Sequence, residues 1–213
     1  MPKKLALLMI VSAFSMGLTA CGGNEEMASH DDMEEMEATA PASSEAAPIE
    51  APMEMLGGGH ATLVHEGAGG SPHVNVHWGV NDANITITYG RPFLRDRVVG
   101  ESVPPMADAV WRLGADEATT LATDSDLMIG DAHVPAGEYT LWTAHMGGEF
   151  HLIINSETGQ WGTAYNGEHD LAHVAMEVGE LPTPAEQLVI SLTEDSLGFD
   201  WGAMTASVPL IVH

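Results

Sequence analysis

The chain has four arginines, and all of them fall within 22 residues, at Arg91, Arg95, Arg97 and Arg112. A planar guanidinium binds carboxylate, phosphate or sulfate through parallel hydrogen bonds. Two interpretations follow. The arginines converge on an anionic ligand, or they stabilise the fold internally, with Arg112 paired to Asp116 or Glu117.

Aromatic side chains near these arginines offer flat surfaces for stacking. Together with the arginines and one carboxylate they form the candidate ligand-binding set Tyr89, Arg91, Trp111, Arg112, Glu117 and Trp161. The sequence does not identify the small molecule or protein that such a set would bind.

Histidines suggest a second kind of chemistry. His73 and His77 are four residues apart on an expected strand and therefore share a face. With another of the eleven histidines, such as His145, His151, His169 or His173, they could bind zinc or copper. No H-E-x-x-H or C-x-x-C spacing occurs, so scattered surface histidines are the competing interpretation and we expect no cofactor.

Methionine and histidine also alternate near the N-terminus. Thioether and imidazole groups suit Cu(I), and the segment contains them at three-residue spacing, at Met27, His30, Met33 and Met36, followed by Met53, Met55, His60 and His65. The alternatives are periplasmic copper handling and an acidic linker that merely tolerates methionine.

Evidence for hydrolysis is limited to the abundance of acidic residues. The chain lacks G-x-S-x-G, and its 31 carboxylates always offer some pair for glycosidase-type chemistry. An envelope hydrolase therefore stays a third alternative, and no catalytic residue is assigned.

Residues 1–20 have the three parts of a secretory leader: two lysines, an apolar run too short to span a bilayer, and small residues before Cys21. Leu18-Thr19-Ala20-Cys21 resembles a bacterial lipobox, in which the cysteine is acylated after cleavage. We expect a lipid anchor at Cys21 in the cell envelope. Because no Asp follows the cysteine, we expect the outer membrane, facing the periplasm or the cell surface.

Residues 21–70 are predicted to form a disordered acidic tether, ending in two glycine-rich stretches at 57–59 and 67–70. Removing the leader leaves four arginines against 31 carboxylates, a charge of −27. Such a surface repels phosphate backbones, which excludes nucleic acid as a partner. It is also typical of a protein adapted to saline surroundings.

Residues 71–213 alternate in short apolar runs separated by turn residues, which predicts a single antiparallel β-sandwich. Gly147-Gly148 predicts a two-residue hairpin turn. The only expected helical turn is at 104–108. The expected strands are 74–78, 84–89, 118–123, 127–129, 133–134, 138–146, 149–154, 171–177, 187–193, 197–201 and 205–212.

Five motifs follow one another along this domain: Ser71-Pro72-His73, Tyr89-Gly90-Arg91-Pro92, the run from Trp111 to Thr120, the run from Pro135 to Leu141, and Trp161-Gly162. In this order they resemble the bacterial domain-of-unknown-function family 2911. The resemblance implies a secreted or lipid-anchored β-sandwich and no assigned reaction. Leu113 and Asp116 depart from the family's usual Thr and Asn, and Asp96 stands where Gly is common.

The sequence therefore favours a cell-envelope lipoprotein whose β-sandwich is a binding or interaction module. Its expected partner is the membrane, through acylated Cys21.

Overall fold

The computed structural model describes residues 54–213, and within them the strands follow the alternation of the sequence. In the strand 83–90, Ala83, Ile85, Ile87 and Tyr89 are buried, and the residues between them are exposed or half-buried. β-Branched residues fit such a pleated, half-buried surface. The expected leader, Cys21, and the methionine-rich segment with Met27, His30, Met33 and Met36 lie outside the described residues.

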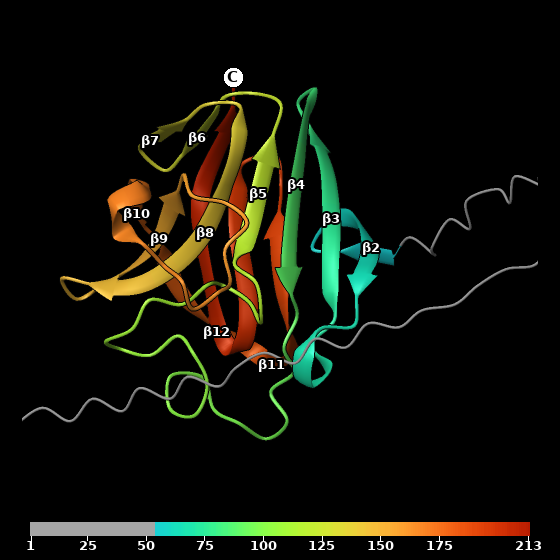
Figure 1. Ribbon diagram of the computed structural model, residues 1–213, viewed down its shortest axis with the longest axis vertical. Helices are drawn as coiled ribbons and strands as arrows, with labels where there is room; N and C mark the ends of the chain where they lie inside the picture. The colour runs from blue at the N-terminus through green and yellow to red at the C-terminus, as the bar shows by residue number, and fades with distance from the viewer. Residues whose placement is uncertain (1–53) are drawn as a thin grey trace, which may run out of the picture. The chain divides into compact units, whose positions relative to one another are not determined.

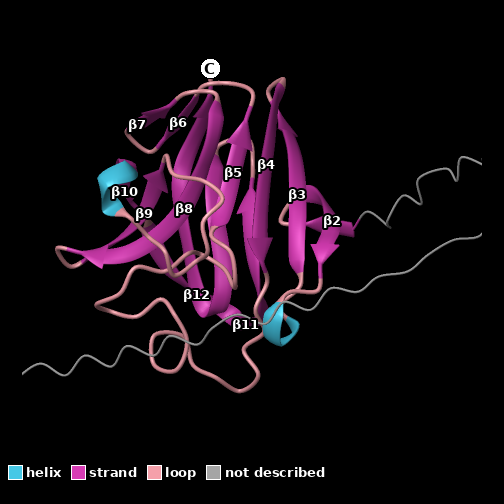
Figure 2. Ribbon diagram, viewed as in Figure 1, coloured by secondary structure: helices cyan, strands magenta, loops and turns pink. Residues whose placement is uncertain are grey.

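Two antiparallel sheets make up the domain, so the predicted β-sandwich is confirmed (Figures 1 and 2). The larger sheet has the order β1-β2-β3-β4-β5-β8-β9-β10, and the smaller one has the order β11-β12-β6-β7. The elements are β1 (Glu54–Leu56), β2 (Gly59–His65), the short 3₁₀ turn η1 (Ala68–Gly70), β3 (His73–Val80), β4 (Ala83–Gly90), β5 (Thr119–Thr123), β6 (Leu127–Ile129), β7 (Ala132–Val134), β8 (Gly137–Met146), β9 (Glu149–Asn155), the 3₁₀ turn η2 (Gly167–His169), β10 (Asp170–Ala175), β11 (Glu177–Leu192) and β12 (Ser196–Val212).

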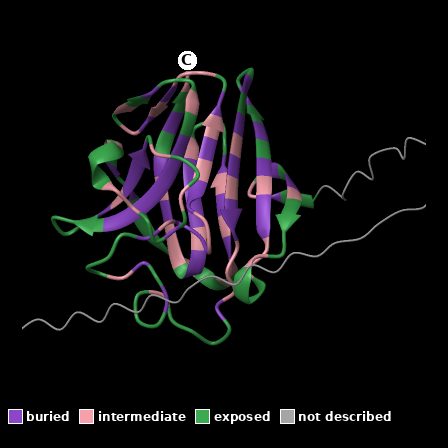
Figure 3. Cartoon of the chain, in the orientation of Figure 1, coloured by how far each residue is buried: buried purple, intermediate pink, exposed green. Residues whose placement is uncertain are grey.

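The core lies between the sheets, and both contribute apolar side chains to it. Figure 3 shows the buried residues of the strands in purple. Ile87 and Leu121 from the larger sheet and Phe199 and Trp201 from the smaller one are almost fully buried. Burial of such side chains contributes about 1.5–3 kcal/mol each. Among the described residues, no helix is long and apolar enough to cross a membrane.

The N-terminal boundary of the fold differs from the prediction. Residues 54–65, expected to belong to the disordered tether, form the hairpin β1–β2 on the edge of the larger sheet. Gly57 and Gly58 make its turn with φ of 56° and 87°, which glycine adopts without strain. The Gly57 carbonyl accepts hydrogen bonds from Trp78 Nε1 and from the backbone N–H of Leu192. The Gly57 carbonyl therefore joins the hairpin to Trp78 of β3 and to the end of β11.

The expected helical turn at 104–108 is wrong, because this stretch is a loop of bends and turns. Pro104 and Pro105 have no N–H to donate to a helix. The Pro104 carbonyl instead accepts a hydrogen bond from Trp201 Nε1 at 2.9 Å. The loop is part of the long connection between β4 and β5, drawn below the sheets in Figure 1.

Candidate functional site

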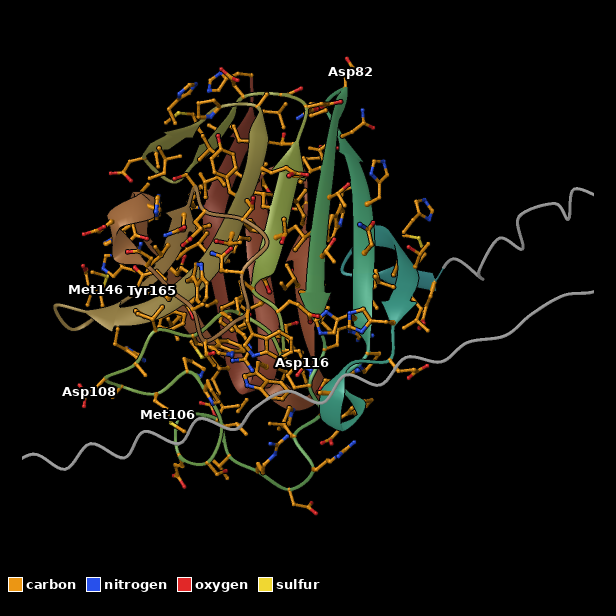
Figure 4. All side chains as sticks on the ribbon, viewed as in Figure 1. Asp82, Met106, Asp108, Asp116, Met146 and Tyr165 are labelled. Atoms are coloured by element: carbon orange, nitrogen blue, oxygen red, sulfur yellow. The ribbon has the colours of Figure 1, made fainter. Side chains whose placement is uncertain are left out.

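Four of the five sequence motifs meet at one end of the sandwich, around the connection between β4 and β5. Figure 4 labels Asp116 at this end. Backbone hydrogen bonds join the four segments: Arg91 N to Pro72 O at 2.9 Å, Ala115 N to Gly90 O at 3.2 Å, and Gly162 N to Asp116 O at 3.0 Å. The motif from Pro135 to Leu141 lies elsewhere and forms the turn into β8.

Two glycines allow these segments to approach closely. A Cβ on Gly90 would lie 2.4 Å from the Ala115 carbonyl oxygen and 2.6 Å from His73 Nε2. A Cβ on Gly162 would lie 1.8 Å from Arg112 Cδ. A side chain at either position would push the motif segments apart.

The loop also holds non-glycine residues in the left-handed region. Leu113 and Asp116 have φ of 50° and 60°. Asp and Asn tolerate this region better than other residues do, whereas leucine there is strained. Such strain is often found at functional sites. Asp96 also lies in the left-handed region, with φ of 63°. Glycine adopts this conformation without strain, which explains why the family commonly has Gly at this position.

A cavity of about 530 Å³ lies between this loop and β12. Trp111 and Trp201 give it apolar walls, and Ser71 and Asp116 add polar atoms. Three of the four arginines also line it: Arg95, Arg97 and Arg112. We refer to it below as the arginine cavity.

The guanidinium groups have few partners. Among the described residues, every ion pair within 4.0 Å has a histidine as its cation, so none of the arginines is paired there with a carboxylate. Arg97 donates to the Leu94 carbonyl at 2.8 Å and to Phe93. Arg112 donates one long hydrogen bond, 3.4 Å, to the Gly162 carbonyl, and its Nε is buried without a partner.

The interpretation in which Arg112 pairs directly with Asp116 or Glu117 is therefore wrong. Both carboxylates turn toward histidines instead. Loss of solvent lowers the pKa of Arg112, although the nearby charges of Asp116 and Glu117 raise it in part. Arginine stays protonated nevertheless, so the guanidinium is a half-buried cation with unused donors.

Next to the cavity, two histidines and two carboxylates lie close together: His65, His73, Asp116 and Glu117. We refer to them below as the histidine cluster. The buried His73 Nε2 lies 3.0 Å from Glu117 Oε2 and 3.4 Å from Asp116 Oδ2. His65 Nε2 lies 3.6 Å from Glu117 Oε1, and its ring stacks on that of His73 with centroids 4.3 Å apart. Asp116 Oδ2 also accepts from the Ala68 N–H at 2.7 Å. Asp116 thus belongs to both the cavity wall and this cluster.

The structure separates the predicted ligand-binding residues. Trp111 and Arg112 line the arginine cavity, and Glu117 lies in the histidine cluster. Tyr89 is buried, its hydroxyl accepts from the Ile190 N–H at 3.1 Å, and burial raises its pKa. Arg91 donates to the Leu188 carbonyl and does not line the cavity. Trp161 is half exposed and bridges to Glu117 through its backbone.

His73 and His77 do face the same side of β3, but they do not form one site. Four residues along a strand span about 13 Å. His77 contacts Thr86 Oγ1 instead, at 3.3 Å. The partner of His73 is His65, which lies opposite it on β2. The sequence named His65 only with the Met/His tether, because residues up to 70 were assigned there, and so did not bring it together with His73. The signal for the pairing lies between β2 and β3, where Gly67, Gly69 and Gly70 allow the chain to turn back.

A family model described as "Protein of unknown function (DUF2911)" matches residues 71–210. The chain belongs to this family. No curated protein and no solved structure matches the chain. For this member of the DUF2911 family, function must therefore be argued from the site itself.

Proposed function

We propose that this DUF2911 protein is a lipid-anchored envelope protein whose β-sandwich binds a small organic anion in the arginine cavity. One observation carries the proposal. Three arginines line a single cavity, and no carboxylate of the described residues lies within ion-pair distance of them. In a chain with 31 carboxylates, unpaired cations gathered in one cavity require a reason.

The donors available in the cavity suit a carboxylate, sulfate or phosphate group. A guanidinium has five N–H donors in a fixed plane. Arg112 uses only one of them, in a long bond, and the described residues give the Arg95 guanidinium no hydrogen bond. An incoming anion would satisfy these donors and offset the desolvation of Arg112.

The shape of the cavity indicates a ligand larger than an inorganic ion. Its volume of about 530 Å³ falls within the usual range for small-molecule sites, about 300–1,000 Å³. Trp111 and Trp201 offer apolar contact beside the charged groups. We therefore propose a ligand with an anionic group and a compact organic body.

Lipid anchoring rests on the leader and on Cys21 in the sequence. Two or three acyl chains hold a protein stably at a membrane, whereas one does not. We propose that the anchor places the domain in the cell envelope, at the outer membrane, facing the periplasm or the cell surface. Mass spectrometry of the mature N-terminus should find acylated Cys21, and an unmodified Cys21 would contradict this part of the proposal.

Anion binding is tested by titrating acetate, succinate, sulfate and phosphate into the mature chain carrying Cys21→Ser. We expect Arg95→Ala, at an exposed position, to weaken binding of the preferred anion about tenfold without changing stability. Arg91→Gln, outside the cavity, is the matched control and should keep the affinity of the parent chain. Equal affinities in the parent and Arg95→Ala chains, or no binding of any anion, would refute the arginine cavity as the site.

One observation favours copper handling as a second candidate. The strand register brings Met55 of β1 opposite His60 of β2, which in turn is opposite His77 of β3. All three are exposed on the outer face of the sheet, and directly opposed side chains on one face lie about 5 Å apart. A thioether and two imidazoles in a row suit Cu(I).

Competition against a chromophoric Cu(I) chelator tests this candidate. If the row binds copper, His60→Ala should lower the affinity of the mature chain about tenfold. His133→Ala, which removes an exposed histidine on β7, is the control. Unchanged competition in His60→Ala would exclude the row. Cu(I) uptake by a peptide of residues 22–56 would assign binding to the segment that contains Met27, His30, Met33 and Met36.

A further inference from the structure

We propose that His65, His73 and Glu117 bind a divalent transition metal ion of the zinc class. One ligand atom from each of the three side chains lies within 4.8 Å of the other two. Two imidazoles and one carboxylate are a ligand set that zinc accepts, with a fourth position left for water or another donor. This site adjoins the arginine cavity, with which it shares only the neighbouring Asp116, and it is distinct from the row of Met55, His60 and His77.

The distances fit an ion placed between these groups. Ligand atoms at about 2.0–2.1 Å from a tetrahedral zinc ion lie roughly 3.3 Å from each other. The His73 Nε2 to Glu117 Oε2 distance is 3.0 Å, and the His65 Nε2 to Glu117 Oε1 distance is 3.6 Å. Binding would therefore need only small movements of these two pairs. The two imidazole nitrogens must also approach each other, which the half-exposed His65 can accommodate.

The buried atoms of the cluster lack hydrogen bonds, which is the second observation for an ion. His73 is 3% exposed, and its Nε2 has no hydrogen-bond partner in spite of the carboxylate oxygen 3.0 Å away. Glu117 Oε2 is also buried without one. Unsatisfied buried polar atoms are rare and need an explanation. An ion bound to both atoms would satisfy them together.

The fold positions the ligands through three separate elements. The register between β2 and β3 places His65 opposite His73, and Gly90 on β4 leaves room beside the His73 ring. Glu117 follows the left-handed Asp116, at the entry to β5. Rigid strands therefore hold both imidazoles, as a preorganised site requires.

Surrounding groups would complete the site. Asp116 Oδ2 lies 3.4 Å from His73 Nε2 and is the nearest further atom that could bind the metal ion. The hydrogen bond that it accepts from the Ala68 N–H holds it in place. The Gly67 N–H donates to His65 Nδ1, and this bond must be given up when Nε2 binds metal and the proton moves to Nδ1. Gly67 is partly exposed, so a water molecule can replace that bond.

The test uses the metal-free mature chain carrying Cys21→Ser, with Zn²⁺ competed against a chromophoric chelator and Co²⁺ followed by its visible absorption. We expect one tightly bound zinc and a tetrahedral cobalt spectrum. His65→Ala and Glu117→Gln should each raise the zinc dissociation constant at least about tenfold, since losing a ligand costs no less than losing a supporting contact. His77→Ala, also an exposed histidine of the outer face, should change it less than about twofold.

Folding of the variants is measured separately. His65 is half exposed, so His65→Ala should melt with the parent chain when metal is absent, and only the parent should gain thermal stability when zinc is added. Absence of stoichiometric zinc uptake by the parent would overturn the proposal. So would equal zinc affinity in the parent, His65→Ala and Glu117→Gln chains, because the ion would then bind elsewhere.

Discussion

At the scale of single residues, Asp116 links the two candidate sites. Its carboxylate lies in the wall of the arginine cavity, accepts from Ala68, and stands 3.4 Å from His73. Its φ of 60° is one that Asn also tolerates, so the change from the family's usual Asn preserves the backbone and adds a charge. The added charge raises the pKa of Arg112 and attracts the imidazole, which affects both sites at once.

The stability effect of removing Arg112 distinguishes a free guanidinium from a paired one. Breaking a buried ion pair would cost about 3–5 kcal/mol. Because only a long hydrogen bond to Gly162 is lost, we expect Arg112→Ala to reduce the free energy of unfolding by about 1–2 kcal/mol. Arg112→Met, which keeps much of the apolar stem over Gly162, should cost less than about 1 kcal/mol. Urea unfolding measures both, and a loss above about 3 kcal/mol in both variants would restore the ion-pair interpretation.

At the scale of elements, the sequence predicts what depends on local pattern. The alternating Ile and Thr residues predict a strand at 84–89, which the structure has as β4 at Ala83–Gly90, and Gly147-Gly148 predicts the hairpin of β8 and β9. The hairpin β1–β2 was missed because β1 has only three residues and the glycines of the turn suggested flexibility. What fixes those glycines is distant in the chain: the side chain of Trp78 and the backbone of Leu192.

The candidate site was predictable only in part for the same reason. Clustering of the arginines in the sequence did indicate a common location, and three of them share one cavity. Which of them is free depends on long-range contacts, such as the bond from Arg91 to the carbonyl of Leu188, 97 residues away. His65 and His73 meet through strand register, which residue types alone do not specify.

The junction of the motif segments can be tested through Gly90. A methyl group there would meet the backbone oxygen of Ala115, which cannot move without displacing the loop. We expect Gly90→Ala to lower the free energy of unfolding by about 1–3 kcal/mol, as overpacking does. Gly79→Ala on the neighbouring β3, where nothing lies within 4 Å of the added Cβ, should stay within about 0.5 kcal/mol of the parent. Chemical denaturation compares them, and equal effects would mean that the junction is loose.

The β1–β2 hairpin can be tested by truncation. A chain beginning at residue 67 loses the buried Leu56 and Ala61 and leaves β3 as an unpaired edge strand. We expect a lower melting temperature and more aggregation than in a chain beginning at residue 54, because exposed edges pair with other chains. Differential scanning calorimetry and light scattering measure the two effects. Matching behaviour of the two truncated chains would show that the domain does begin near residue 71, as its sequence first suggested.

At the scale of the whole molecule, charge is distributed unevenly. Residues 54–213 contain 22 carboxylates, and their only arginines or lysines are the four arginines around one end. The histidine cluster and the arginine cavity therefore lie where the cations of the domain are concentrated. An acidic protein with such an end attracts anions there and repels them elsewhere, which directs a small anionic ligand to the cavity.

The same charge excess predicts that salt stabilises the fold. Raising sodium chloride from 0.1 to 1 M shortens the screening length from about 10 Å to about 3 Å, which weakens repulsion among the carboxylates. We expect the melting temperature of the mature chain to rise over this range. Chloride bound in the arginine cavity would also stabilise the protein, and Arg95→Ala separates the two causes. A rise that persists in this variant reflects screening, and one that disappears reflects chloride binding. A melting temperature independent of salt in the parent would show that the carboxylates are too dispersed to destabilise the sandwich.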